Sequence, residues 1–202
     1  MYRIQTFRSL HEQQDHDYLS VETYSWGGDY RPKTRAELIF LEDAGFLLTM
    51  RCQERDPAAV YTQDDDPVYT DSCMEAFLNF YPAESDRGYL NFEMNANGAL
   101  LCQIGPDRFD RRFVRSLGIT PPKPEARVDR ENGFWEVKLL ISLKFIQEIY
   151  GRNDFAPGHR MTGNFYKCGD NTAVAHFGSW QPIQFEKPCF HLPEFFGELV
   201  LA

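Results

Sequence analysis

Two neighbouring stretches with alternating apolar residues constrain the fold of this chain most strongly. Residues 73–81 read CMEAFLNFY, and residues 89–97 read YLNFEMNAN. Successive side chains of a strand point to opposite faces, so each stretch predicts one apolar and one polar face. The connector, residues 82–88, is rich in turn-forming residues. The two stretches are therefore predicted to form a β-hairpin with two unlike faces.

The apolar residues also predict the register of this hairpin. A symmetric turn places Leu78 opposite Phe92 and Ala76 opposite Met94. It gathers eight apolar side chains on one core face: Met74, Ala76, Leu78, Phe80, Leu90, Phe92, Met94 and Ala96. A slip of one residue would turn this set to the other face. The same register places Glu75 opposite Asn95.

The opposite face of the hairpin is unusually rich in amides. It carries Asn79, Asn91, Asn95 and Asn97 together with Glu75 and Glu93. Asn is depleted in strands, so solubility alone does not account for this set. Carboxamides and carboxylates present hydrogen-bonding groups at short reach, which suits a ligand covered in hydroxyls. The alternative is that a loop covers this face and the Asn side chains bond to its backbone.

The rest of the chain consists of short strand-like runs separated by turns. Strands are expected at residues 18–26, 35–42, 46–53, 126–130, 134–141, 161–168 and 195–201. Residues 142–150 have the spacing of a helix, with Ser142 as N-cap and Gly151 as its stop. Residues 105–122 are expected to form a long polar excursion. We therefore predict an all-β fold, an antiparallel β-sandwich with one short helix, forming a single domain over residues 1–202.

Composition excludes several classes of partner. The net charge of −9 argues against nucleic acid and against an anionic membrane surface. No stretch has the length of apolar residues that a membrane helix needs. The first residues lack the apolar region of a signal peptide, and the five cysteines have no C-x-x-C spacing. We therefore expect a cytoplasmic protein with free thiols, whose oligomeric state the sequence leaves open.

Several motifs occur in a fixed order along the chain. They are DSCMEAFL at 71–78, NFEMN at 91–95, the run around Trp135 that ends at residue 143, NFYKC at 164–168, HFGSW at 176–180, and residues 190–197. Their order and spacing resemble family 9 carbohydrate-binding modules, in the bacterial branch often called family 9-like. The resemblance spans about residues 18–200. It implies a β-sandwich that binds sugar ends without catalysis, holding the terminal ring between two aromatic side chains.

The resemblance also suggests site residues. Tyr69 holds the position of the first aromatic, where characterised modules have Trp, and Trp180 aligns with the second. Glu75 matches the Glu of the family's first strand. The second strand matches by residue type only, through Asn91, Glu93 and Asn95. The predicted ligand-binding residues are thus Tyr69, Glu75, Asn91, Glu93, Asn95 and Trp180. An aromatic face offers a flat apolar wall to a pyranose ring, and polar groups orient it.

Metal and haem sites receive less support. Structural calcium occurs in the family, and the run Asp64, Asp65 and Asp66 offers hard oxygen ligands. The run lacks the spacing of an EF-hand loop, which favours a solvated acidic loop, so no cofactor is expected although calcium is possible. A haem site that uses Met94 is disfavoured, because the register places Met94 on the core face.

Two other functions stay open. The first is a glycoside-processing enzyme that uses Glu75 and Glu93. The register makes these residues diagonal neighbours roughly 7 Å apart at Cβ, which is compatible with the carboxyl spacing of inverting glycosidases. The second is a protein-interaction domain that uses the polar face. Arg108, Arg111 and Arg112 could also reach over that face, although such a charge run is usually solvated.

Overall fold

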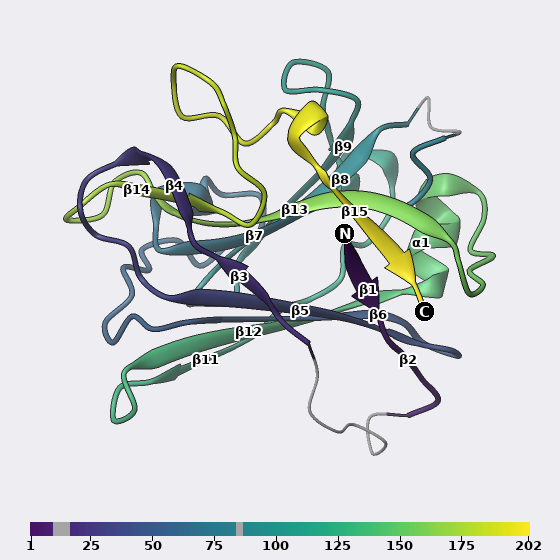
Figure 1. Ribbon diagram of the computed structural model, residues 1–202, viewed down its shortest axis with the longest axis horizontal. Helices are drawn as coiled ribbons and strands as arrows, with labels where there is room; N and C mark the ends of the chain where they lie inside the picture. The colour runs from purple at the N-terminus through teal and green to yellow at the C-terminus, as the bar shows by residue number, and fades with distance from the viewer. Residues whose placement is uncertain (10–16, 84–86) are drawn as a thin grey trace.

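The computed structural model describes residues 1–9, 17–83 and 87–202, and it contains two β-sheets packed face to face (Figure 1). Within these residues the first sheet has nine strands: β1 (Tyr2–Ile4), β15 (Gly197–Leu201), β13 (Arg160–Gly169), β7 (Cys73–Asn79), β8 (Tyr89–Asn95), β9 (Leu100–Gly105) and β10 (Arg112–Phe113) in spatial order, with β14 (His176–Ser179) paired to β13 and β4 (Thr23–Gly27) paired to β14. The predicted β-sandwich is confirmed.

The second sheet lies below the first in the view of Figure 1. In the described part of the chain it has six strands: β11 (Glu125–Asp129), β12 (Phe134–Ser142), β6 (Gly45–Cys52), β5 (Thr34–Leu41), β2 (Thr6–Phe7) and β3 (Leu19–Val21), which also pairs with β5. Two pairings, β1 with β15 and β2 with β5, are parallel, and the other described pairings are antiparallel.

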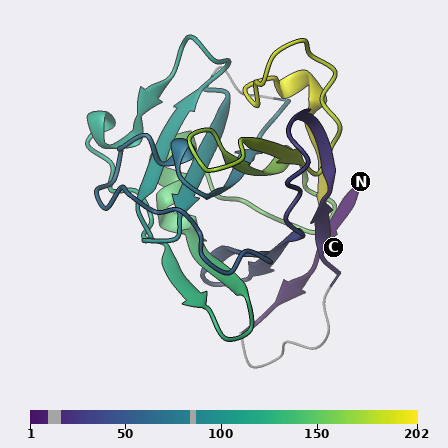
Figure 2. The ribbon, with the colours of Figure 1, turned by 90° about the vertical axis from the view of Figure 1, so that its left-hand side faces the viewer.

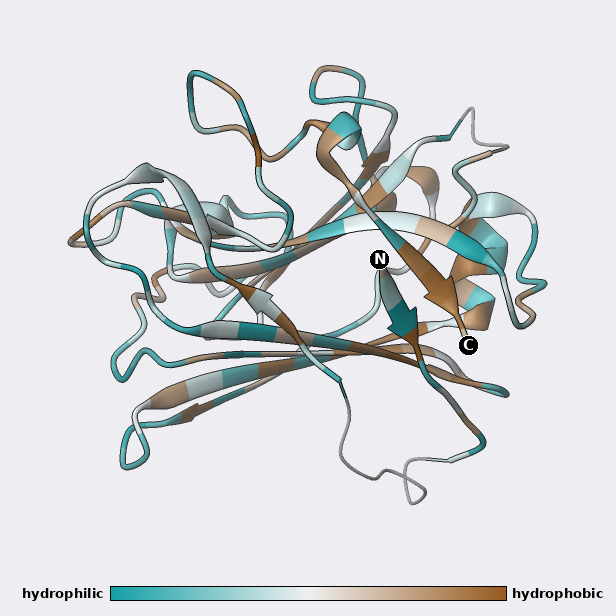
Figure 3. Ribbon diagram, in the orientation of Figure 1, coloured by the Kyte–Doolittle hydropathy of each residue, from teal (hydrophilic) through white to brown (hydrophobic). Residues whose placement is uncertain are grey.

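One apolar core fills the space between the sheets. It includes the inner faces of β7 and β8, as the alternation predicts, and Trp135, Val137, Leu139 and Ile141 of β12. Apolar segments recur along the strands of both layers (Figure 3). A second apolar cluster, which includes Phe77, Tyr89, Tyr166 and Phe190, lies on the outer face of the first sheet. This sheet is therefore covered on both faces.

The central hairpin has the predicted faces, but the predicted register is wrong by two residues. Leu78 lies opposite Leu90, and Glu75 lies opposite Glu93 instead of Asn95. A shift of two residues keeps every side chain on its face. Strand β7 ends at Asn79, whose side chain accepts a hydrogen bond from the Tyr81 backbone N–H (3.2 Å). Phe80 then packs in the core.

The predicted helix is present as α1 (Leu143–Tyr150). The Ser142 side chain accepts a hydrogen bond from the Phe145 N–H (3.1 Å), and Gly151 ends the helix in the left-handed conformation at φ 76°. The helix buries Phe145, Ile146 and Ile149 at one end of the sandwich, on the right in Figure 1. In the described residues it is the one α-helix, and no helix is long and apolar enough to cross a membrane.

Several elements differ from the predicted ones. The expected strand at residues 18–26 is divided between β3 in the second sheet and β4 in the first. Strands β1, β2, β9 and β10 were not predicted. Short 3-10 helices in the described part of the chain lie at η2 (Val68–Thr70), η3 (Val114–Leu117) and η4 (Pro193–Phe195). Because β1 pairs with β15, the two ends of the chain lie on the same side of the molecule (Figure 2).

Candidate functional site

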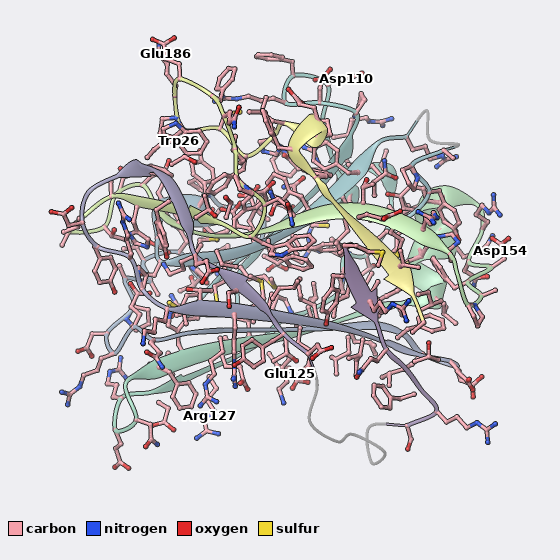
Figure 4. The ribbon with its side chains drawn as sticks, in the orientation of Figure 1. Trp26, Asp110, Glu125, Arg127, Asp154 and Glu186 are labelled. Carbon is pink, nitrogen blue, oxygen red and sulfur yellow. The ribbon has the colours of Figure 1, made fainter. Side chains whose placement is uncertain are left out.

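A cavity of about 460 Å³ lies on the outer face of the first sheet. Its floor comes from β7, β8, β9, β13 and β14, and its walls come from residues 65–69, 108–113 and 188–191. Two of these walls belong to loops that rise above the sheet, and Figure 4 labels Asp110 and Glu186 on them. The volume is in the range of about 300–1,000 Å³ that is usual for small-ligand sites.

Two buried carboxyl groups lie on the floor of this cavity. Glu75 of β7 and Glu93 of β8 are direct cross-strand neighbours, with 2% and 4% of their surface exposed. The Glu75 carboxylate accepts a hydrogen bond from the Cys168 thiol (2.8 Å), and the Glu93 carboxylate accepts one from the Asn91 side chain (2.8 Å). The two groups were expected to be diagonal neighbours, and the shifted register brings them side by side.

Burial controls the protonation of both groups. It raises the pKa of Glu75 well above its ordinary value, and the nearby Cys168 and Glu93 act in the same direction. It raises the pKa of Glu93 to about 7, against the opposing effects of the Asn91 hydrogen bond and the Arg111 charge. The floor of the cavity therefore carries carboxyl groups that hold protons more strongly than exposed Glu residues do.

Asn91 positions an arginine at the edge of the cavity. Its side-chain oxygen accepts a hydrogen bond from Arg111 Nε (3.1 Å). The Arg111 guanidinium also donates to the carbonyls of Gly105 and Tyr89, and it lies 4.3 Å from the centre of the Tyr89 ring. Asn91 therefore joins Glu93 to Arg111, while Glu93 and Arg111 themselves line the cavity. This arrangement fixes the direction of both charged groups.

Asn95 has a different role from the one predicted. Its side-chain nitrogen donates to the Tyr61 carbonyl (2.8 Å) and to the Asp71 carboxylate (2.9 Å), and its oxygen accepts from the Asn97 N–H (3.1 Å). It is fully buried and is not among the residues that line the cavity. At this end of the hairpin, the alternative of a loop bonded by Asn side chains describes the structure.

The two predicted aromatic residues do not face one cavity. Tyr69 lies in η2, lines the cavity and is 40% exposed. Trp180 is absent from the cavity lining, and it packs on the Phe165 ring (5.9 Å between centroids) and closely against Gly197. Along β14, the side chain of Phe177 faces the cavity, so Trp180, three residues later, falls on the core side. The expected pairing of Tyr69 with Trp180 is therefore wrong.

Several residues that line the cavity were not among the predicted ligand-binding residues. Phe177 lies opposite Cys168 in the β13–β14 ladder and supplies aromatic surface to the cavity. The alternation within HFGSW was the signal that could have separated it from Trp180. Arg108 and Arg111 both line the cavity, whereas Arg112 is exposed and does not. His191 also lines it, and burial, followed by the charges of Arg111 and Arg108, lowers its pKa to about 3.

The acidic run is paired with an arginine. Asp64 and Asp65 both form ion pairs with Arg115, at 3.4 Å for Asp65. Asp64 Oδ1 additionally accepts a hydrogen bond from the Leu100 N–H (3.1 Å). Asp65 Oδ1 is the one buried side-chain oxygen or nitrogen in the described residues without a hydrogen-bond partner, and Asp65 lines the cavity.

Comparison with known families agrees with this architecture. The profile of carbohydrate-binding family 9 matches residues 6–201, nearly the whole chain. The chain belongs to this family. No curated protein matches it.

Several solved structures have the same fold. A crystal structure of a candidate carbohydrate-binding protein from Bacteroides uniformis ATCC 8492 is 27% identical, with a TM-score of 0.79 over 99% of this chain and 98% of that one. A family 9 module from Caldicellulosiruptor kristjanssonii in complex with glucose has a TM-score of 0.67 at 14% identity, over 99% and 95% of the chains. The same kind of module in complex with cellotriose has a TM-score of 0.65 at 13% identity, over 98% and 93%.

Proposed function

We propose that this protein binds carbohydrate without catalysis, and that the cavity on the outer face of the first sheet holds a terminal sugar ring. The observation that carries this proposal is the combination of Glu75 and Glu93 on the floor with Tyr69 at the wall of one cavity, in a chain of carbohydrate-binding family 9. Polar groups that converge below an aromatic wall are the usual composition of a sugar site.

Each lining group has a role in this proposal. The Tyr69 ring, with Phe177, offers an apolar surface to the C–H side of a pyranose. The Glu75 and Glu93 carboxyls exchange hydrogen bonds with ring hydroxyls, and Arg108 supplies further donors from the loop above. Asn91 contributes indirectly, because it orients Glu93 and Arg111.

A glycosidase is the weaker alternative. Its two carboxyl groups must flank the glycosidic bond, one to protonate the leaving group and the other to attack or to activate water. Glu75 and Glu93 are adjacent on one floor, so a sugar above them meets both groups from the same side. Binding requires only this one-sided contact, which is why we favour it.

A glycan array followed by calorimetry tests the proposal. Glucose and cellotriose are the first ligands to use, since the Caldicellulosiruptor module structures are complexes with these two sugars. We expect saturable 1:1 binding to one or more neutral sugars and no release of reducing ends after long incubation. A silent array would contradict carbohydrate binding and favour a protein-interaction domain, and release of reducing ends would establish the enzyme.

A further inference from the structure

Two cysteines and a glutamate form a cluster in the floor of the cavity. Pairing of β7 with β13 places Cys73 directly opposite Cys168. Glu75, two residues after Cys73, points to the same face of the sheet. One donor atom from each of the three residues lies within 4.8 Å of the other two, and the Cys168 Sγ is 2.8 Å from Glu75 Oε1. Three groups that commonly ligate metals therefore converge on one point.

The cluster is buried and rigidly held, as metal ligands in proteins usually are. Cys73, Cys168 and Glu75 are each no more than 2% exposed, on two strands that are fixed by the central sheet. Cys168 and Glu75 also line the cavity, so one side of the cluster faces open space. A zinc site that binds an exogenous ligand has this arrangement, with three protein ligands and one open coordination position.

We propose that Cys73, Glu75 and Cys168 bind a thiophilic divalent cation, Zn²⁺ in the first place, with its fourth coordination position facing the cavity. Ligand atoms of a tetrahedral zinc site lie about 3.5–4 Å apart, given bonds of about 2.0–2.3 Å, so small side-chain rotations close the site. Two thiolates select zinc over calcium, which prefers oxygen ligands. Arg108 and Arg111 line the same cavity and offset the remaining negative charge.

Binding exchanges protons for the metal and involves no redox step. In the metal-free protein, Cys168 donates its thiol hydrogen to Glu75. Zinc binds thiolates and carboxylates, so the Cys73 and Cys168 protons leave to solvent as the two Zn–S bonds form. At least two protons per zinc are therefore released, and affinity rises with pH. The assay needs no sugar, so its result does not depend on the proposed function.

The test is a titration of the reduced, metal-free full chain with Zn²⁺, by calorimetry in buffers of different protonation enthalpy. We expect one zinc per chain and release of at least two protons. Co²⁺ should give a thiolate-to-metal charge-transfer band with tetrahedral d–d bands. Cys168→Ser and Glu75→Gln should weaken zinc binding at least tenfold. Cys102→Ser, a change at a buried cysteine of β9 outside the cluster, should leave it unchanged.

Thermal unfolding of each variant without metal confirms that it is folded. If Cys168→Ser does not fold, Glu75→Gln and Cys73→Ser carry the test, because they alter different atoms of the same site. Absence of a charge-transfer band in the folded reduced protein would overturn the proposal. Zinc binding that is equally strong in the variants and in the unaltered chain would also overturn it.

Discussion

At the scale of single residues, the most informative feature is the pair of buried glutamates on the floor of the cavity. Burial of an isolated carboxylate is costly, and like charges directly opposite on neighbouring strands repel. Glu75 and Glu93 meet both conditions. Their raised pKa values reduce the cost, because protonation removes the charge. A stable fold gains nothing from this arrangement that two apolar residues would not provide, which supports a role in ligand binding.

The first prediction concerns pH. Because the pKa of Glu93 is raised to about 7, this group gains its charge as pH rises through 7. A carboxylate accepts stronger hydrogen bonds from hydroxyls than a protonated carboxyl does. Sugar affinity should therefore increase between pH 6 and 8, and Glu93→Gln should flatten this dependence. Calorimetry at several pH values measures both. An affinity that falls over this range would show that the protonated form binds.

The second prediction concerns the aromatic wall. Tyr69→Ala should weaken sugar binding by about 1–2 kcal/mol, roughly fivefold to thirtyfold, because the apolar surface for the ring is lost. Phe109→Ala is the matched control, since Phe109 is 93% exposed and does not line the cavity. Calorimetry with the same sugar compares the two variants. Equal sugar affinities of Tyr69→Ala and Phe109→Ala would show that Tyr69 does not contact the sugar.

At the scale of elements, the alternation of side chains between the two faces of a strand determines which side chain reaches the cavity. The alternation in 73–81 and 89–97 correctly predicts the apolar and polar faces of the hairpin, because side-chain direction follows from sequence position alone. The register was not predictable in the same way, since a shift of two residues keeps every side chain on its face and leaves the alternation unchanged. The family resemblance favoured Trp180 as a sugar ligand, whereas the alternation of side chains along β14 favours Phe177. The loop contacts of Asn95 had no local signal in the sequence.

The third prediction follows from this alternation. Trp180 packs on Phe165 and Gly197, so Trp180→Ala should lower the free energy of unfolding by about 3 kcal/mol through cavity formation. The folded fraction should bind sugar with unchanged affinity. Phe177→Ala should show the reverse, with weaker binding and a smaller loss of stability. Chemical denaturation and calorimetry on both variants test this. If Trp180→Ala were fully stable but no longer bound sugar, Trp180 would be a sugar ligand and this prediction would be wrong.

At the scale of the whole molecule, a buried ion pair joins the two sheets. Lys167 of β13 is fully buried, and its ammonium lies 3.4 Å from the carboxylate of Glu54, just beyond β6. The same carboxylate accepts a hydrogen bond from Trp135 of β12 (2.9 Å). Although burial alone would raise the pKa of Glu54, Lys167 and the hydrogen bonds hold it below its ordinary value. His176 accepts a further hydrogen bond from Lys167 (2.7 Å).

The fourth prediction uses this pair. Glu54→Gln leaves the buried Lys167 ammonium without its counter-charge, which should lower the free energy of unfolding by about 3–5 kcal/mol. Asp56→Asn, which breaks the surface pair with Arg130, should cost no more than about 1 kcal/mol. Urea denaturation measures both. A Glu54→Gln variant as stable as Asp56→Asn would contradict a stabilising role of the Lys167–Glu54 pair.

An NMR titration of the ¹⁵N-labelled protein with cellotriose, followed at the backbone amides, is the most direct test of where the sugar binds. We expect the largest shift changes at the cavity residues Tyr69, Glu75, Glu93, Arg111 and Phe177, and no shift changes at residues of the second sheet. A second groove, lined by Arg51 and Phe134, lies on the second sheet and serves as an internal reference. Shift changes confined to that groove, or no changes at saturating sugar, would contradict the assignment of the binding site to the outer face of the first sheet.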